Sequence, residues 1–193
     1  MKRNTIILIA IVAALALWSV AVYNGLINRE EAVKQAWSQV ENDYQRRADL
    51  IPNLVATVKG YAAHESSTLQ NVIDARSKAT QVQVDPTNLT SESILAYQQA
   101  QGEIGAALSR LLMIQENYPD LKANQNFLEL QAQLEGTENR ITVARKRFNE
   151  AAQQYNVSLR RFPQNLVAKM FGFQPQAYFE TEAGNETAPT VSF

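Results

Sequence analysis

The residues best suited to chemistry lie in two short clusters, and the first of them does not complete a catalytic motif. His64 and Glu65 match the opening of a zincin motif, which needs a second histidine four residues after the first, but position 68 is Thr. The chain has one histidine and no cysteine, so a single subunit cannot supply a multi-histidine or thiolate zinc site. We interpret the pair as polar residues at a helix boundary, and we expect no metal site.

The second cluster is Arg46-Arg47-Ala48-Asp49, in which Arg47 occupies a position within an otherwise apolar stripe. A guanidinium removed from water needs carboxylate or carbonyl partners. We therefore expect a buried ion pair that fixes helix register, with Asp49, Glu138 or Glu135 as the acceptor if the first and last long helices pack together. A site for an anion or another ligand is the alternative interpretation.

Other signatures of catalysis or cofactor binding are missing from the sequence. It contains no G-x-S-x-G, P-loop or G-x-G-x-x-G motif, and no Glu-x-x-His pairs of the di-iron type. Gly102 and Gly105 lie within a helical pattern with Ala106, where small residues allow a neighbouring helix to approach closely. The scattered carboxylates form no pair suited to acid–base work, so we expect neither enzymatic activity nor a cofactor.

Composition favours an all-α protein without nucleic-acid partners. The 18 Lys and Arg nearly balance the 19 Asp and Glu, so no global field attracts nucleic acid. Seven Gly and six Pro in 193 residues are few for a turn-rich β fold, whereas Ala, Gln, Leu and Glu are plentiful. About 165 residues remain beyond the apolar N-terminal segment, which is the usual size of one domain.

The N-terminal segment is expected to be a single-pass membrane anchor. The run from Ile6 to Tyr23 is uncharged, and as a helix it is ~27 Å long, close to the ~30 Å hydrocarbon core. Lys2 and Arg3 precede it and favour a cytoplasmic N-terminus, which places the remaining domain on the extracytoplasmic side of the inner membrane. A cleavable signal peptide is the alternative, because Ala14-Leu15-Ala16 resembles a cleavage site.

Helical periodicity predicts four long helices after the anchor. The first continues directly from the membrane segment and carries Pro52 as an expected kink; a weak boundary at residues 60–67 separates it from a second, shorter helix. A third helix spans about residues 91–117, after N-terminal capping chemistry at Thr90 or Ser91. The fourth has a heptad seam over residues 127–162. The predicted fold is an elongated antiparallel four-helix bundle behind a transmembrane helix.

The C-terminal part combines an apolar element with an acidic tail. Residues 166–173 are expected to pack on the end of the bundle, or else to contact the membrane surface or a neighbouring subunit. The residues proposed for these contacts are Leu166, Val167, Met170, Phe171 and Phe173. Three glutamates without any Lys or Arg, together with Pro175 and Pro189, predict a flexible or partner-dependent tail over residues 174–193. The expected divisions are an anchor at 1–27, a helical domain at 28–173 and this tail.

Several motifs together resemble the LemA family of bacterial membrane proteins. The resemblance covers essentially the whole chain, and the block from Arg46 to Val55 is its most specific part. The other matching segments are Tyr23-Asn24-Gly25-Leu26, Ala36-Trp37-Ser38-Gln39-Val40, Val58-Lys59-Gly60-Tyr61, His64-Glu65, Glu138-Asn139-Arg140-Ile141, Ala144-Arg145, Phe148-Asn149, Tyr155-Asn156, Phe162-Pro163, Phe171-Gly172-Phe173 and Tyr178-Phe179. The resemblance implies a short anchor joined to a four-helix domain, and it implies no catalytic residue or cofactor.

Two functions fit these observations. The first is a membrane-anchored structural or scaffolding protein that self-assembles into a homo-oligomer through its long helical seams. The second is a membrane-tethered adaptor that presents a groove or the acidic tail to a signalling or envelope protein complex. An enzyme is a distant third.

Overall fold

The computed structural model describes residues 2–180, and no strand occurs among them. This confirms the all-α prediction and the apolar N-terminal helix. The helices are α1 (Lys2–Tyr61), α2 (Ser66–Gln81), α3 (Ser91–Met113), the 3-10 helix η1 (Ile114–Asn117), α4 (Pro119–Lys122), α5 (Gln125–Arg160) and α6 (Gln164–Met170).

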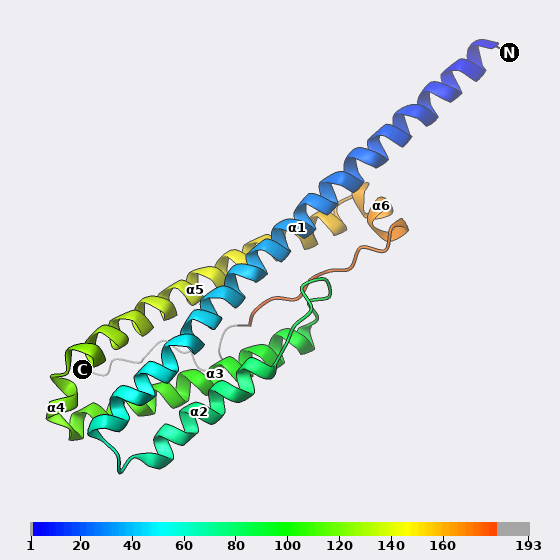
Figure 1. The fold of residues 1–193 in the computed structure, drawn as a ribbon. Helices are drawn as coiled ribbons and strands as arrows, with labels where there is room; N and C mark the ends of the chain where they lie inside the picture. The colour runs from blue at the N-terminus through cyan, green and yellow to red at the C-terminus, as the bar shows by residue number, and fades with distance from the viewer. Residues whose placement is uncertain (1, 181–193) are drawn as a thin grey trace, which may run out of the picture.

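Helix α1 is continuous for sixty residues and passes through Pro52 without ending. Its N-terminal part projects beyond every other element (Figure 1), and its apolar side chains are exposed there, Leu17 at 74%. α1 contains a stretch that is long and apolar enough to cross a membrane. No flexible segment separates this stretch from the residues that pack in the helical domain, as the uninterrupted apolar stripe predicted.

Helix boundaries follow the local chemistry of the sequence. A turn at residues 62–65 separates α1 from α2, which shows that the expected weak boundary is a true break. Thr90 caps α3 by accepting a hydrogen bond from the Ser93 amide at 3.2 Å, while the Ser93 hydroxyl accepts one from the Thr90 amide at 3.1 Å. Asn124 caps α5 in the same way through the Phe127 amide.

The four long helices lie alongside one another over the C-terminal part of α1 (Figure 1). α1 packs along α5, α2 packs along α3, and a contact between α1 and α2 joins the two pairs. α3 and α5 approach each other less closely than the helices within each pair. This unequal spacing leaves a seam between α3 and α5.

The buried side chains form two separate cores. The proximal core, nearer the apolar N-terminal part of α1, is aromatic and is centred on Trp37, Tyr97, Phe148 and Phe179. The distal core, nearer α4, is mainly aliphatic; its largest buried members include Ile51, Leu54, Ile104, Leu111 and Phe127.

Residues 174–180 differ from the expected flexible tail. They form an extended segment on the helical domain, with Phe179 only 5% exposed. The amide of Asn156 exchanges two hydrogen bonds with the backbone of Gln176, and Asn149 does the same with Phe179. The predicted domain boundary at residue 173 is therefore too early, because these amides satisfy a backbone that lacks secondary structure. Residues 181–193 lie outside the described residues.

Candidate functional site

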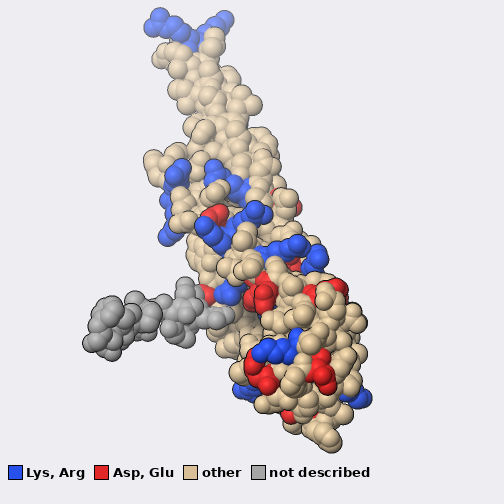
Figure 2. All heavy atoms as spheres, turned by 90° about the vertical axis from the view of Figure 1, so that its left-hand side faces the viewer, with Lys and Arg blue, Asp and Glu red and all other residues tan. Residues whose placement is uncertain are grey.

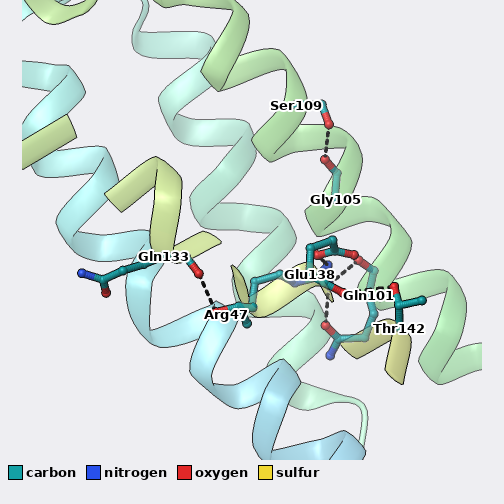
Figure 3. Close-up of polar contacts among 8 residues, drawn as sticks. Arg47, Gln101, Gly105, Ser109, Gln133, Glu138 and Thr142 are labelled. Carbon is teal, nitrogen blue, oxygen red and sulfur yellow. Dashed lines mark hydrogen bonds and ion pairs between the residues drawn. The ribbon is translucent and has the colours of Figure 1, made fainter. Parts of the chain in front are cut away.

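The candidate site is built around Arg47, whose side chain is 3% exposed in the middle of the helical domain. Its Nη1 donates to Glu138 Oε2 at 3.0 Å, and its Nη2 donates to the backbone oxygen of Gln101 at 2.7 Å and to Gln101 Oε1 at 2.9 Å (Figure 3). The guanidinium carbon also lies 5.0 Å from the ring centre of Tyr44. Three helices thus share one buried cation.

Helical spacing explains why this polar group separates the two cores. On α1, Arg47 follows Tyr44 of the proximal core by three residues and precedes Ile51 of the distal core by four. On α3, Gln101 stands between members of the same two cores, and on α5 so does Glu138. Residues three or four apart share a helix face, so the three side chains form one polar layer across the domain.

The polar layer is only partly shielded from water. Glu138 is 58% exposed, so its carboxylate keeps much of its hydration while it compensates the buried guanidinium. Arg47 Nε is buried and has no hydrogen-bond partner within the described residues. Burial raises the pKa of the neighbouring Tyr97 phenol well above its usual range, so that phenol stays neutral.

A groove of about 500 Å³ opens beside this layer, between α3 and α5. Gly102, Gly105 and Ala106 line its α3 side, and Glu135 and Glu138 lie on its α5 side. A Cβ added at Gly102 would meet no atom within 4 Å, and one at Gly105 would meet only Arg47 Nη1, at 3.9 Å. These glycines were expected to admit a neighbouring helix closely. In the structure they leave open space instead, because α5 packs on α1 rather than on α3.

The C-terminal segment 174–180 leads into this groove. The backbone oxygen of Glu180 accepts hydrogen bonds from Gln98 of α3 and from Arg145 of α5, both at 3.1 Å. Both side chains also line the groove. Arg145 additionally covers the ring of Phe179 at 5.0 Å. The segment therefore fills the proximal part of the α3–α5 seam, and the groove is the part of the same seam that follows it.

The structure separates the acceptors proposed for Arg47. Glu138 contacts the guanidinium, whereas Asp49 is exposed and accepts a hydrogen bond from Gln45 at 2.7 Å. Asp49 could not have been the partner, because side chains two residues apart point to different faces of a helix. Glu135 lines the groove and accepts a hydrogen bond from Gln131.

The His64-Glu65 pair lies in the turn between α1 and α2. His64 is exposed, and Glu65 Oε1 accepts a hydrogen bond from the Tyr118 hydroxyl at 3.3 Å. Among residues 2–180, no three His, Asp or Glu side chains are grouped to hold a metal ion.

The C-terminal apolar residues divide into a buried and an exposed set. Val167 is buried against the domain, and Phe173 is partly buried, with its ring centre 5.6 Å from that of Tyr23. Leu166, Met170 and Phe171 remain 53 to 68% exposed. Only this exposed set is available to a partner or a membrane.

Some residues of the site were not evident in the sequence. Gln101 supplies two acceptors to Arg47, but a glutamine among alanines and glycines gives no signal of burial. Asn149 and Asn156 hold the C-terminal segment; in the sequence they stand out only as polar residues after the aromatic seam positions Phe148 and Tyr155, within two of the segments that resemble the LemA family.

Comparison with known proteins identifies the relatives of this chain. The magnetosome protein MamQ 2 of Paramagnetospirillum magneticum is 27% identical over 182 residues, which cover 86% of this chain and 67% of that protein. MamQ of Magnetospirillum gryphiswaldense is 28% identical with the same coverage. Protein LemA of Metamycoplasma hominis is 24% identical over 81% of this chain and 68% of that protein. The LemA family model matches residues 36–193, and the chain therefore belongs to the LemA family.

Proposed function

We propose that this chain is a non-catalytic, membrane-anchored structural protein that self-assembles and holds its helical domain in a fixed orientation to the bilayer. The observation that carries the proposal is the continuity of α1 from its apolar N-terminal part into both cores. A tethered enzyme or receptor domain tolerates a flexible linker, whereas a structural element that orders neighbours on a membrane needs a rigid one.

The proposal extends to architecture and location. The four long helices act as one elongated antiparallel bundle, anchored by a single span in the inner membrane with the domain on the extracytoplasmic side. The names of the MamQ relatives assign them to the magnetosome. By analogy, we infer that this chain works within a membrane-bound assembly and contacts an envelope protein there.

Self-assembly is tested by the mass of the full-length chain in detergent, measured by size-exclusion chromatography with light scattering. We expect a defined oligomer at micromolar concentration. A matched variant carries a four-residue Gly-Ser insertion between Asn28 and Arg29, which breaks α1 but keeps the span and most of the domain. We expect this variant to form oligomers of several different sizes. A strictly monomeric wild-type chain would overturn the proposal.

An adaptor is the second candidate, and the α3–α5 groove favours it. Residues 174–180 show that this seam accepts extended backbone, which is held by side chains from both helices. The groove beyond them offers apolar contact at Leu108, Leu112 and Leu134, with Arg47 near its floor. An extended segment of a partner protein that carries an apolar side chain fits this lining.

Site-specific photocrosslinking distinguishes the adaptor from the scaffold. A photoreactive residue at Ser109, which lines the groove, should yield a crosslink to one partner of reproducible mass. The same residue at Leu128, an exposed position on α5 that does not line the groove, is the matched control. The variant Gly102→Phe fills the groove and should abolish the Ser109 crosslink. Equal crosslinking at both positions, or no effect of Gly102→Phe, would remove the adaptor.

A further inference from the structure

We infer that the outer face of α6 and the residues beside it form a second membrane contact, which inserts into the headgroup layer next to the span and favours anionic phospholipid. We call these residues the α6 collar: Phe162, Leu166, Met170 and Phe171 as its apolar part, and Arg160, Arg161 and Lys169 as its basic part. The inference deepens the proposed function and rests on its anchored, rigid α1.

Packing places the collar at the level of the membrane. Val22 and Leu26 of α1 are buried in the proximal core together with Val167 and Ala168 of α6. The ring of Tyr23 lies 4.8 Å from that of Phe171. α6 and Phe171 therefore pack beside the last turn of the apolar stretch and the turn that follows it.

Helix length makes this position a membrane contact. If α6 and the α1 residues that it covers stood in water, the stretch left to span the bilayer would be residues 6–21, or ~24 Å at the usual rise per residue. The hydrocarbon core needs ~30 Å. Lys2 and Arg3 lie close before the apolar run, separated from it by Asn4 and Thr5, and they limit how far the helix can shift. With Val22 and Tyr23 the stretch is ~27 Å, so the span comes closest to the thickness of the hydrocarbon core when α6 lies at the boundary of the same leaflet.

The exposed side chains of the collar suit that boundary. Phe162 is 81% exposed, Met170 68% and Leu166 59%, and the last two are four residues apart on one face of α6. α6 ends at Met170, and Gly172 follows with a φ of 75°, which lets the Phe173 amide donate a hydrogen bond back to the Ala168 oxygen at 3.0 Å. This turn directs Phe173 to Tyr23 and leaves the outer face uncovered by any described residue.

Charge selects an anionic leaflet over a neutral one. Residues 151–179 contain the cations Arg160, Arg161 and Lys169 and no carboxylate. The closest carboxylates along α1, Glu30 and Glu31, lie 4.0 Å and 2.8 Å from Lys34. Figure 2 shows Lys and Arg gathered on the part of the domain next to the span, and Asp and Glu mostly farther from it. Basic side chains beside inserted apolar groups are typical of surfaces that bind anionic lipid.

The test uses the full-length chain in vesicles, and the absence of native cysteine makes single-site labelling direct. A fluorophore on Met170→Cys reports the collar. The matched control is Met113→Cys, the same residue type at 63% exposure on the far end of α3. Quenchers are aqueous iodide and phosphatidylcholine with a nitroxide near its glycerol backbone. Vesicles are pure phosphatidylcholine, or equal parts of phosphatidylcholine and phosphatidylglycerol.

We expect nitroxide lipid to quench the position 170 probe severalfold more than the position 113 probe. Iodide should quench the position 113 probe more than the position 170 probe. The difference in nitroxide quenching between the two positions should be largest in anionic vesicles. Replacing Arg160, Arg161 and Lys169 with Gln should reduce quenching in anionic vesicles to its level in neutral ones. Equal iodide access at both positions would overturn the inference. Protection from iodide without lipid quenching would also overturn it, because a second copy would then cover α6. The readout is independent of oligomer mass, so a monomeric chain that passes this test would refute self-assembly alone.

Discussion

The proximal and distal cores differ in how the α3–α5 seam is filled beside them. In the proximal core the chain returns, and residues 174–180 place Phe179 against Trp37 and Phe148, with ring centres 5.7 and 5.4 Å apart respectively. Beside the distal core no described residue enters the seam, and a groove stays open. The same helices α1 and α5 run through both regions. α3 and α5 therefore do not close the space between them unless a further segment packs there.

The largest expected effect tests whether the two cores unfold together. Phe148→Ala in the proximal core and Phe127→Ala in the distal core each remove a ring that is 0% exposed, and each should cost about 3–5 kcal/mol of unfolding free energy. Urea unfolding of the full-length chain in detergent is followed by Trp37 fluorescence in a Trp18→Phe background and by far-UV circular dichroism. Because α1 and α5 are unbroken, both variants should shift both signals.

Separate transitions would break this view of one cooperative unit. If Phe127→Ala changed the helical signal and left Trp37 emission unchanged, the polar layer would be an insulating boundary between two folding units. Leu128→Ala, at a 43% exposed neighbouring position, is the control and should cost well under half as much.

The next effect concerns the polar layer. Arg47→Ala should cost about 3 kcal/mol, because it empties a buried site and leaves the Gln101 acceptors without their donor. Glu138→Gln should cost about 1 kcal/mol or less, because the side chain is 58% exposed and keeps an oxygen that can accept the bond. The same urea titration measures both. Equal losses would show that the exposed carboxylate, not the buried guanidinium, dominates the layer.

A third effect tests whether the C-terminal segment belongs to the proximal core. Asn156→Ala removes the bonds to the backbone of Gln176, at 2.7 and 2.9 Å, and should cost about 2 kcal/mol. Gln131→Ala, which loses an exposed bond on the same helix, should cost well under 1 kcal/mol. If the two variants were equally stable in urea, the segment would contribute nothing to the proximal core.

A smaller effect, in this case a gain in stability, is expected at the seam between α3 and α5. Gly102→Ala should stabilise the chain by about 0.5–1 kcal/mol, because alanine favours the helix and its Cβ enters open space. The midpoint of urea unfolding should rise accordingly. A loss of stability would mean that another group occupies the groove in solution.

The smallest effect is pH dependent and lies in the proximal half. Burial raises the pKa of the Glu41 carboxyl, so the folded state binds that proton more tightly than the unfolded chain does. This contribution is fully present below the unfolded pKa of about 4.3 and is lost as pH rises through the folded value. Glu41→Gln should therefore raise the urea midpoint at pH 7, and the gain should shrink toward pH 4. A gain of the same size at pH 4 and at pH 7 would contradict this role of Glu41.

Sequence patterns predicted the elements that local chemistry controls. Thr90, Asn124 and the proline-bounded C-terminal end of α5 mark helix ends through effects that act within a few residues. Arg47 was identifiable because a cation in an apolar stripe demands compensation. Its partner Glu138 is 91 residues away, and only the packing of α1 on α5 distinguishes it from the nearer Asp49.

Features that depend on tertiary contacts were missed or misjudged. The glycines of α3 allow either close packing or an open groove, and the position of α5 decides between them. Residues 174–180 have the composition of a flexible tail, yet Asn149 and Asn156 satisfy their backbone from a distant part of the chain. No local pattern encodes such hydrogen bonds, so a segment that its composition predicts to be flexible can still be ordered.

If α1 spans the bilayer as proposed, its continuity makes the helical domain follow every change in the tilt of the span. Spanning helices tilt by ~20° on average and tilt further in thinner membranes. Residues 24–61 form ~57 Å of the same rod, so a 20° tilt displaces the far end sideways by ~20 Å. A change in lipid composition that alters bilayer thickness by a few ångströms would therefore move the distal core sideways by a much larger distance. Because α6 lies against one side of α1, it would limit the direction of that movement.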